Sequence, residues 1–435
     1  MPQENYNIVS WADAWRIYSR PTVLGMVFFG FSAGLPYLLV FSTLTAWLTE
    51  EGVSRSAIGL FAWVGMTYSV KVIWAPIVDR VSIPFVGRVL GQRRSWIFFG
   101  QILVVVGLIA ISILGASNLP LLALVSVIVA FGSSTQDIAI DAYRIEAIEE
   151  KYQGAMSASY ILGYRIALLV AGAGALYVAS FTDWSNVYLI MAALMSIGFG
   201  AVLLAKEPLF SRQRLIQETD GAFNVQKFDF LSAVINPFKD FFSRNGTFAL
   251  LIILLISVYR LSDIVMGIMA NPFYLDMGFS KIEIANITKV FGFFMTILGA
   301  FVGGLMIIKW GVGHCLLIGA IAVAITNLFF AKLALLESPD LNWLALTVSL
   351  DNLSGGFATT AFIAYLSGLT NKAYTATQYA LFSSLMTLPG KFMSGFSGLV
   401  VDSYGYFSFF LSAAALGLPA ILLIWFYFKN QGNAI

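Results

Sequence analysis

The sequence has 435 residues, of which 59% are hydrophobic and only 11% are charged. Because a soluble domain of this length carries about twice that share of charged residues on its surface, the composition excludes a soluble globular protein and favours a membrane protein. The net charge of +2 identifies no partner, while one cysteine and one histidine exclude an internal disulfide and argue against a thiol cluster or a histidine-rich metal site.

Twelve apolar runs follow one another along the chain, separated by charged residues or by proline and glycine. A bilayer core of about 30 Å needs roughly 20 apolar residues in one helix, and only helices satisfy the backbone of such segments inside lipid. The first twenty residues contain no short apolar core with a cleavage site, so we expect a retained first span and no cleavable signal peptide. The predicted spans are residues 22–48, 56–78, 95–115, 120–143, 155–180, 184–205, 246–271, 283–308, 313–334, 342–368, 375–400 and 405–428.

Basic residues lie mostly on one side of these spans. The connections on the side of the N-terminus hold most of the 25 lysines and arginines, whereas the connections on the other side hold only Arg55 and Lys281. Because cytoplasmic loops carry an excess of basic residues, both termini are predicted to be cytoplasmic and the number of spans to be even.

The chain is predicted to consist of two halves of six spans. The longest polar segment, residues 206–244, is basic and divides an N-terminal bundle, residues 1–205, from a C-terminal bundle, residues 245–435. The halves repeat weakly at an offset of about 226 residues, which pairs Arg165 of the fifth span with Lys391 of the eleventh. Parallel repeats of this kind surround a central site in secondary transporters.

Ionisable side chains are predicted inside the spans, where each costs at least ~2.5–3.5 kcal/mol and therefore faces a cavity or a partner. The basic members outnumber the acidic ones, which favours a substrate with carboxylates or phosphates over a cation. Lys332 lies near a helix end and is interpreted as a residue that reaches the interface. The members are Lys71, Arg165, Arg260, Lys289, Lys332, Lys391, Asp137, Asp141, Asp263 and Asp351.

The fourth span carries a polar row. Asp137, Asp141 and Arg144 lie on one face of the helix, and Gln136 precedes them. One interpretation is a proton-coupling carboxylate with substrate contacts, which we favour for the deeper Asp137. The other is a salt-bridged gate at the cytoplasmic end, which we favour for Asp141 and Arg144.

Three other spans contribute charges near the middle of the membrane. Arg260 and Asp263 are three residues apart in the seventh span and can pair with each other. Arg165 lies about 15 Å into its helix, and Asp351 lies at a similar depth from the other side. A proton gradient drives uptake if such an aspartate is protonated outside and deprotonated inside. The sequence contains no phosphate-binding loop, so ATP-driven pumping is not supported.

Three helix breaks and the loop between the second and third spans are candidates for segments that move during transport. Three proline-containing segments, residues 34–36, 271–272 and 388–390, are expected to interrupt the first, seventh and eleventh spans and either line a cavity or serve as hinges. Asp79 and Arg80 end the second span, and Arg93 and Arg94 begin the third. The carboxylate is expected to cap neighbouring helix dipoles and to pair with arginines across this loop.

Short motifs surround the charged membrane residues, and most of these motifs lie in the first half. They are residues 30–36, 71–80, 134–142, 162–165, 260–263, 286–289 and 351–356. With these motifs the chain resembles the AmpG family of muropeptide permeases, bacterial inner-membrane members of the major facilitator superfamily. The resemblance covers nearly the whole chain and implies an all-α membrane protein with the major facilitator fold, about twelve helices in two six-helix bundles.

The resemblance also implies a function. The family imports anhydro-muropeptides, which are N-acetylglucosamine–anhydro-N-acetylmuramic acid disaccharides bearing short peptides, from the periplasm for peptidoglycan recycling, with a role in β-lactamase induction. Uptake is expected to depend on the proton gradient. The expected partners are the muropeptide, the proton and membrane lipid, without nucleic acid, cofactor or metal. The chain is expected to be a monomer in the bacterial inner membrane.

Roles are expected for specific residues. Tyr37 and Trp63 are candidates to stack on sugar faces. The proton-coupling candidates are Asp137, Asp141, Asp263 and Asp351. The substrate-binding candidates are Tyr37, Lys71, Gln136, Arg165, Arg260, Lys289, Asn352 and Lys391. The gate candidates are Asp79, Arg80, Arg93, Arg94 and Arg144.

Three other functions stay open at this point. The first is uptake of another bulky anion such as acetyl-coenzyme A. Muropeptide-specific rescue of a recycling-defective cell would separate this function from the preferred one. The second is a membrane enzyme acting on lipid-linked sugars, which the single histidine and sparse loop carboxylates disfavour. The third is a sensor without transport, which the many costly membrane charges disfavour.

Overall fold

The structure is a computed structural model, and it describes residues 16–53, 61–209, 230–394 and 396–430. Within these residues the chain is helical and contains no strand. The helices of the first bundle are α2 (Pro21–Leu39), α3 (Ser42–Glu50), α5 (Met66–Ser69), α6 (Ala75–Arg80), α7 (Val86–Leu90), α8 (Gln92–Leu114), α9 (Leu119–Glu146), α10 (Gln153–Leu169), α11 (Ala175–Ala179), α12 (Trp184–Leu194) and α13 (Ser196–Leu204).

A connecting helix and a second bundle follow. A single turn of 3₁₀-helix, Lys372–Tyr374, precedes α21, and a π-helical turn, Ala285–Phe291, precedes α19. The helices are α15 (Phe230–Asn245), which belongs to the connection, and α16 (Ala249–Tyr259), α17 (Leu261–Asp276), α18 (Lys281–Ile284), α19 (Gly292–Leu333), α20 (Leu341–Leu369), α21 (Thr375–Ser394), α22 (Ser397–Ala415) and α23 (Leu418–Asn430).

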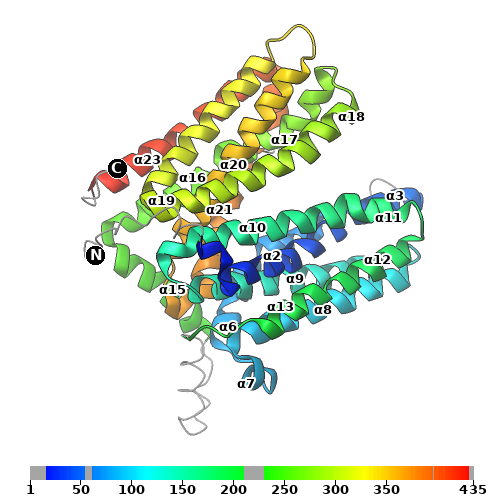
Figure 1. The fold of residues 1–435 in the computed structure, drawn as a ribbon, viewed down its shortest axis with the longest axis vertical. Coiled ribbons are helices and arrows are strands. Elements are labelled where there is room, and N and C mark those ends of the chain that lie inside the picture. Colours follow the sequence, from blue (N-terminus) through cyan, green and yellow to red (C-terminus); the bar gives the residue numbers. More distant parts are fainter. Residues whose placement is uncertain (1–15, 54–60, 210–229, 395, 431–435) are drawn as a thin grey trace.

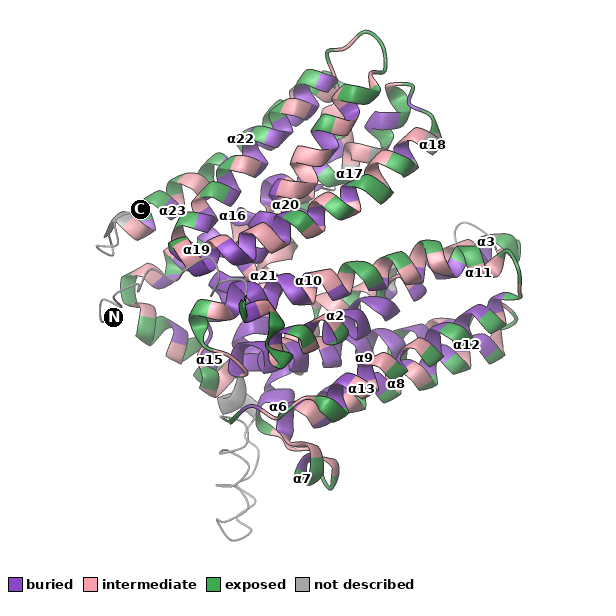
Figure 2. Cartoon of the chain, viewed as in Figure 1, coloured by how far each residue is buried: buried purple, intermediate pink, exposed green. Residues whose placement is uncertain are grey.

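The two bundles meet at one end and diverge toward the other (Figure 1). They meet where α6, α15 and α21 lie, and we call this the closed end. They diverge toward α3 and α18, which mark the opposite end. Buried residues are concentrated where α10, α19 and α21 come together (Figure 2). The fold of two six-helix bundles is therefore as predicted.

Several predicted spans are broken by glycine or by short turns. Eight stretches are long and apolar enough to cross a membrane. One of them contains all of α19, whose 42 residues are interrupted at Gly311, which has a φ of 81°. The helices α20 and α21 coincide with the predicted spans 342–368 and 375–400 but are not among these eight stretches. The eight stretches confirm a membrane protein with several spans, and the number twelve stays a prediction.

Glycine lets pairs of helices approach backbone to backbone. A Cβ at Gly30 of α2 would overlap the carbonyl oxygen of Tyr160 in α10, and one at Gly163 of α10 would overlap that of Val27. The second bundle repeats this arrangement between α19 and α20, where Gly299 lies against Leu353. Without a hydrophobic driving force in lipid, such close packing is a main source of helix association.

The expected breaks at proline are not where the helices end. The segments 34–36 and 388–390 lie inside α2 and α21, and Pro272 lies inside α17. The first span is interrupted a few residues later, at Val40, and the seventh is interrupted at Arg260, where α16 ends. Proline removes one backbone donor but keeps a helical φ, so a helix whose freed carbonyl finds another donor continues.

Candidate functional site

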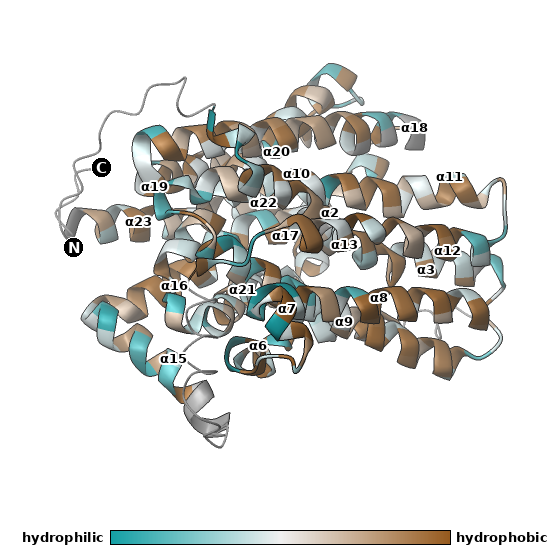
Figure 3. Cartoon of the chain, turned by 60° about the horizontal axis from the view of Figure 1, so that its bottom comes forward, coloured by the Kyte–Doolittle hydropathy of each residue, from teal (hydrophilic) through white to brown (hydrophobic). Residues whose placement is uncertain are grey.

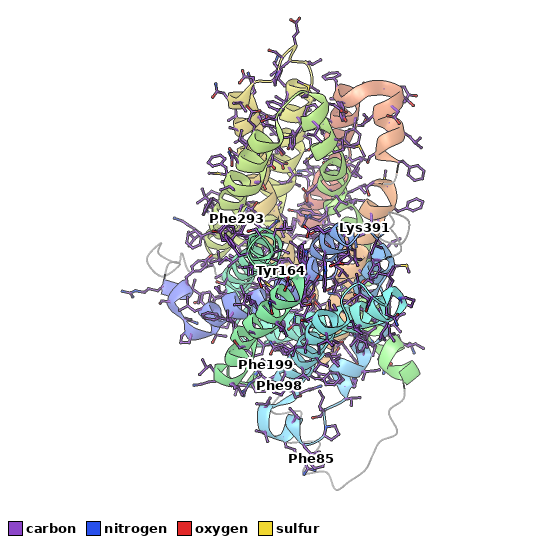
Figure 4. All side chains as sticks on the ribbon, turned by 90° about the vertical axis from the view of Figure 1, so that its right-hand side faces the viewer. Phe85, Phe98, Tyr164, Phe199, Phe293 and Lys391 are labelled. Carbon is purple, nitrogen blue, oxygen red and sulfur yellow. The ribbon has the colours of Figure 1, made fainter. Side chains whose placement is uncertain are left out.

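Four basic side chains lie where the two bundles face each other. Lys71 and Arg165 come from the first bundle, and Arg260 and Lys391 come from the second. The positive charge of Arg260 acts on Arg165, and that of Lys71 acts on Lys391, so each pair is within electrostatic range across the boundary. Figure 4 places Tyr164 and Lys391 at the level where the bundles meet. Like charges held this close favour an anion between them.

Arg260 is partly neutralised within its own helix. Its Nε donates to Oδ2 of Asp263 at 3.0 Å, and its Nη2 also donates to that oxygen. Its Nη1 donates to Oγ1 of Thr359 at 3.0 Å. Both charged side chains are about one quarter exposed, so the pair lines accessible space. The negative charge of Asp263 also acts on Arg165, which connects the pair to the first bundle.

The acidic row of α9 lies beside Lys71. The positive charge of Lys71 acts on the carboxylates of both Asp137 and Asp141. Asp137 keeps one oxygen, Oδ1, buried without a hydrogen-bond partner among the described residues. Asp141 accepts from Nη2 of Arg144 at 3.5 Å. The row therefore runs from an incompletely paired carboxylate to an arginine at the closed end.

Aromatic rings form one wall of the first bundle beside these charges. The rings of Tyr37 and Tyr68 are 5.6 Å apart edge to face, and Phe41 lies 5.0 Å from Tyr37. The Tyr37 side chain is 38% exposed, so it presents a ring to accessible space. Trp63, the second predicted stacking residue, has a side chain outside the described residues.

Two substrate-binding candidates lie inside a bundle instead. Gln136 is fully buried, and its Nε2 donates to the carbonyl oxygen of Ser32 at 2.7 Å. Pro36 has no N–H to offer that carbonyl, so Gln136 replaces the missing helical bond. Asn352 accepts from Oγ1 of Thr296 at 2.8 Å and donates within its own helix. Both side chains thus have partners within their own bundle, and substrate contact by them stays a prediction.

Asp351 and Lys289 complete the candidates of the second bundle. Asp351 of α20 lies beside Thr326 of α19, and the negative charge of Asp263 acts on Asp351. It is thus connected to the Arg260–Asp263 pair. Lys289 lies in the π-helical turn before α19, and its side chain is outside the described residues. The described residues contain no group of acidic, histidine and cysteine side chains that could hold a metal ion.

A buried ion triad joins the two bundles at the closed end. Arg93 is fully buried, and its Nη2 donates to Asp79 at 2.9 Å and to Glu146 at 2.7 Å. Glu146 also accepts from the hydroxyl of Thr375 at 2.7 Å, and Thr375 begins α21 of the second bundle. The charges of the loop and of α9 are thus satisfied together with a helix of the other bundle.

Asp79 also caps that helix directly. Its Oδ1 accepts from the backbone N–H of Ala376 at 2.9 Å, and its Oδ2 accepts from that of Thr377 at 2.7 Å. A helix N-terminus has unpaired donors and a partial positive charge, which together favour a carboxylate there. The capping geometry expected for Asp79 is present, and its target is the N-terminus of α21.

Arg144 forms a second polar contact at the closed end. It is fully buried, and its Nη1 donates to the hydroxyl of Ser367 on α20 at 2.7 Å. The same nitrogen donates to Gln153 and Ser157 of its own bundle, and the guanidinium lies 5.1 Å from the ring centre of Tyr379. Its planar group thus connects three helices, which a lysine ammonium does not reproduce.

The two remaining loop arginines differ in what they contact. Arg80 lies over the ring of Tyr374 at 4.8 Å and so reaches the second bundle. Arg94 donates to the carbonyl oxygens of Val202 and Leu203 and stays within the first bundle. Arg94 was predicted as a member of the gate and of the loop between the second and third spans, and the contacts described for it lie within the first bundle.

Two carboxylates of the closed end were not predicted. Glu146 lies two residues after Arg144, at the end of a span where acidic residues are common. Glu207 lies just after α13 and accepts from the backbone N–H groups of Arg93 and Arg94 at 2.8 and 3.2 Å. Counting the acidic residues available to pair with the basic loop at Arg93 would have pointed to both carboxylates.

Comparison with known proteins identifies similar sequences. A family model described as the Major Facilitator Superfamily matches residues 24–270. "Putative transporter AmpG 4" of Rickettsia felis is 35% identical over 418 residues, which covers 95% of this chain and 98% of that protein. The "Anhydromuropeptide permease" of Escherichia coli is 35% identical over 412 residues, which covers 94% of this chain and 80% of that protein.

Solved structures show the same fold at low sequence identity. A proton:xylose symporter of the major facilitator superfamily aligns with a TM-score of 0.66 at 14% identity, covering 93% of this chain and 94% of that one. The Escherichia coli fucose:proton symporter aligns with a TM-score of 0.66 at 13% identity, covering 93% and 97%. At these identities the similarity concerns the arrangement of helices alone.

Proposed function

The chain belongs to the major facilitator superfamily and, within it, to the AmpG family, and on that premise we propose that it imports anhydro-muropeptides together with protons. It is a membrane transporter and not an enzyme. The observation that carries the proposal is the two pairs of bases across the boundary between the bundles, one of which includes Lys71 beside the carboxylates of α9, together with the exposed ring of Tyr37. Peptide carboxylates fit the bases, and sugar faces fit the rings.

We propose that the acidic row of α9 couples protonation to the gate. Asp137 is partly buried and lies near Lys71, and Asp141 lies one turn further toward Arg144. A proton on Asp141 removes the negative charge that Arg144 contacts, which weakens the position of Arg144 against Ser367. Proton uptake at this row therefore favours opening of the closed end, where substrate and proton are released.

The orientation follows from the distribution of basic residues. With both termini in the cytoplasm, the closed end is cytoplasmic, and the opposite end admits substrate from the periplasm. We propose that the chain acts as a monomer in the bacterial inner membrane, with bundles at residues 1–205 and 245–435 and a connection at 206–244. The described helix of the connection, α15, lies at the closed end (Figure 1), which supports this orientation.

Uptake into right-side-out vesicles tests cargo and coupling. Radiolabelled anhydro-muropeptide is offered with and without an imposed proton gradient, with labelled acetyl-coenzyme A as the competing cargo. We expect gradient-dependent accumulation of muropeptide alone. In Asp137→Asn we expect loss of accumulation against the gradient, while the exposed Asp402→Asn behaves as wild type.

The outcomes separate cargo from coupling. Unchanged accumulation in Asp137→Asn would support the muropeptide as the cargo and would assign proton coupling to Asp141, Asp263 or Asp351. Absence of muropeptide accumulation in correctly folded wild type contradicts the cargo assignment itself.

A further inference from the structure

An apolar cavity lies behind the closed end, away from the space between the bundles. It measures about 210 Å³ and is formed by α15, α16 and α21. Gln378 is the one residue of its lining with a polar side chain, and the exposed lining is entirely apolar. A dry apolar cavity of about 150 Å³ already holds a benzene molecule, so this one accommodates a segment of hydrocarbon chain. The lining includes Phe238, Phe241, Phe242, Ile253, Leu381 and Leu385.

The surface around the cavity continues into lipid. On α15, Phe238 is 36% exposed and Phe242 is 46% exposed, one turn apart on the same strip. On α16, Leu250 and Leu254 are exposed within a stretch that is apolar and long enough to cross the membrane. Figure 3 shows brown and teal residues along α15, which extends beside α16 at the edge of the bundles. Bilayer hydrocarbon therefore reaches the cavity.

A basic group lies at the edge of this apolar strip. Lys239 is exposed and stands next to Phe238, three residues before Phe242. The other charges of the helix are satisfied locally, because Nε of Arg244 donates to Asp240 at 2.9 Å. Among the described residues of α15, the charge without such a pair is that of Lys239. A basic side chain near the membrane surface attracts anionic lipids.

We propose that this cavity binds one acyl chain of an anionic phospholipid, whose headgroup lies against Lys239. The occupant is a lipid of the leaflet on the side of α15, which is the cytoplasmic leaflet in the proposed orientation. The apolar lining, the lipid-facing neighbours and the exposed Lys239 favour this class over a soluble ligand or a protein segment.

The site is connected to the closed end through one residue. Gln378 donates to the carbonyl oxygen of Pro237 and to Asp240, each at 2.9 Å, and so holds α15 on α21. Gln378 directly follows Thr377, and the backbone N–H of Thr377 donates to Asp79. A lipid that stabilises α15 on α21 therefore also stabilises the helix end that Asp79 caps.

Photolabelling of the full-length protein in phosphatidylcholine vesicles tests the proposal. A trace of phosphatidylglycerol with a photoreactive diazirine in its acyl chain is compared with phosphatidylcholine carrying the same chain, and labelled peptides are mapped by mass spectrometry. We expect phosphatidylglycerol to label residues 237–242 and 381–385 several-fold more than phosphatidylcholine does. Lys239→Gln should remove this preference, whereas Lys206→Gln, at an exposed lysine that begins the connection, should not.

Pocket filling supplies the second measurement. Leu385→Trp, or Ile253→Phe if the first variant does not fold, should lower labelling of the cavity several-fold while labelling of lipid-facing α8 stays unchanged. Equal labelling by the two lipids overturns the proposal, as does labelling that is no denser at the cavity than along α8. An equal effect of Lys206→Gln and Lys239→Gln also overturns it, because it shows a general surface charge.

Discussion

The two ends of the molecule treat their polar groups differently. At the closed end, the carboxylates of Asp79 and Glu146 are satisfied partly by the other bundle. At the opposite end, the polar contacts seen in the structure stay within a bundle. There Glu50 accepts from Nε1 of Trp184 at 2.6 Å, both in the first bundle, and Tyr406 donates to Asp276 at 2.5 Å in the second.

This difference shows which contacts stabilise the conformation in which the closed end is shut. Separating the bundles at the opposite end leaves each bundle's own polar contacts intact. Separating them at the closed end exposes Arg93 and removes donors from two buried carboxylates. A buried ion group whose partner is lost is strongly destabilised, so the closed end switches between two discrete arrangements and does not loosen gradually.

The largest effect is expected from Asp79→Asn. The amide cannot pair with the charge of the buried Arg93 or accept as well from both N–H groups of α21. Loss of one partner of a buried ion group costs about 3–5 kcal/mol, and each 1.4 kcal/mol is about tenfold in an equilibrium. We expect the closed end to open at least about tenfold more often.

Thiol labelling from the cytoplasmic side measures this opening. Ala380→Cys in a Cys315→Ala background places a small probe at a buried position between the bundles. The matched control is Asp276→Asn at the opposite end, which should leave the labelling rate unchanged. Equal rates in Asp79→Asn and in the parent would mean that the cap does not hold the gate.

A smaller effect is expected from Arg144→Lys, compared with Arg94→Lys. Both arginines lie at the closed end, but Arg144 reaches Ser367 of the second bundle, while Arg94 binds carbonyls of its own bundle. Because an ammonium does not reproduce the spread of contacts of a guanidinium, we expect several-fold slower uptake in Arg144→Lys only. Equal losses in the two variants would assign the effect to folding and not to the contact between bundles.

The smallest effect concerns pH and Glu207. Burial raises the pKa of Glu207 from 4.5 to about 7, more than the N–H donors of Arg93 and Arg94 lower it. A carboxyl whose pKa is higher in the folded state contributes stability that is present below its unfolded pKa and is lost as the pH rises through the folded pKa. We expect the apparent melting temperature to fall by a few degrees between about pH 5 and about pH 8.

Glu207→Gln removes this titration. Its apparent melting temperature in detergent, followed by tryptophan fluorescence, should change less with pH than that of wild type. The exposed Glu337→Gln should keep the wild-type slope. A slope in Glu207→Gln equal to that of wild type would assign the pH dependence to other groups.

The candidate site could be predicted only by type of residue. Asp137 and Asp351 each lie near another charged side chain of the site, whereas their sequence neighbours Gln136 and Asn352 bond to groups of their own bundle. Successive helix residues point about 100° apart, so a side chain next to a cavity residue faces another helix. Which direction faces the cavity depends on the orientation of α9 and α20 against their neighbours, and polarity alone does not distinguish the two.

Sequence alone determined the membrane class and the all-helical fold, because burial of apolar segments in lipid depends on local composition. It also identified Asp79 and Arg93, because charges beside helix ends need partners. Tertiary structure alone decided that Asp79 caps α21, that Glu146 completes the triad and that the bundles meet at one end. These contacts join residues that are 53 to 297 positions apart, and their distances are set by how the helices pack.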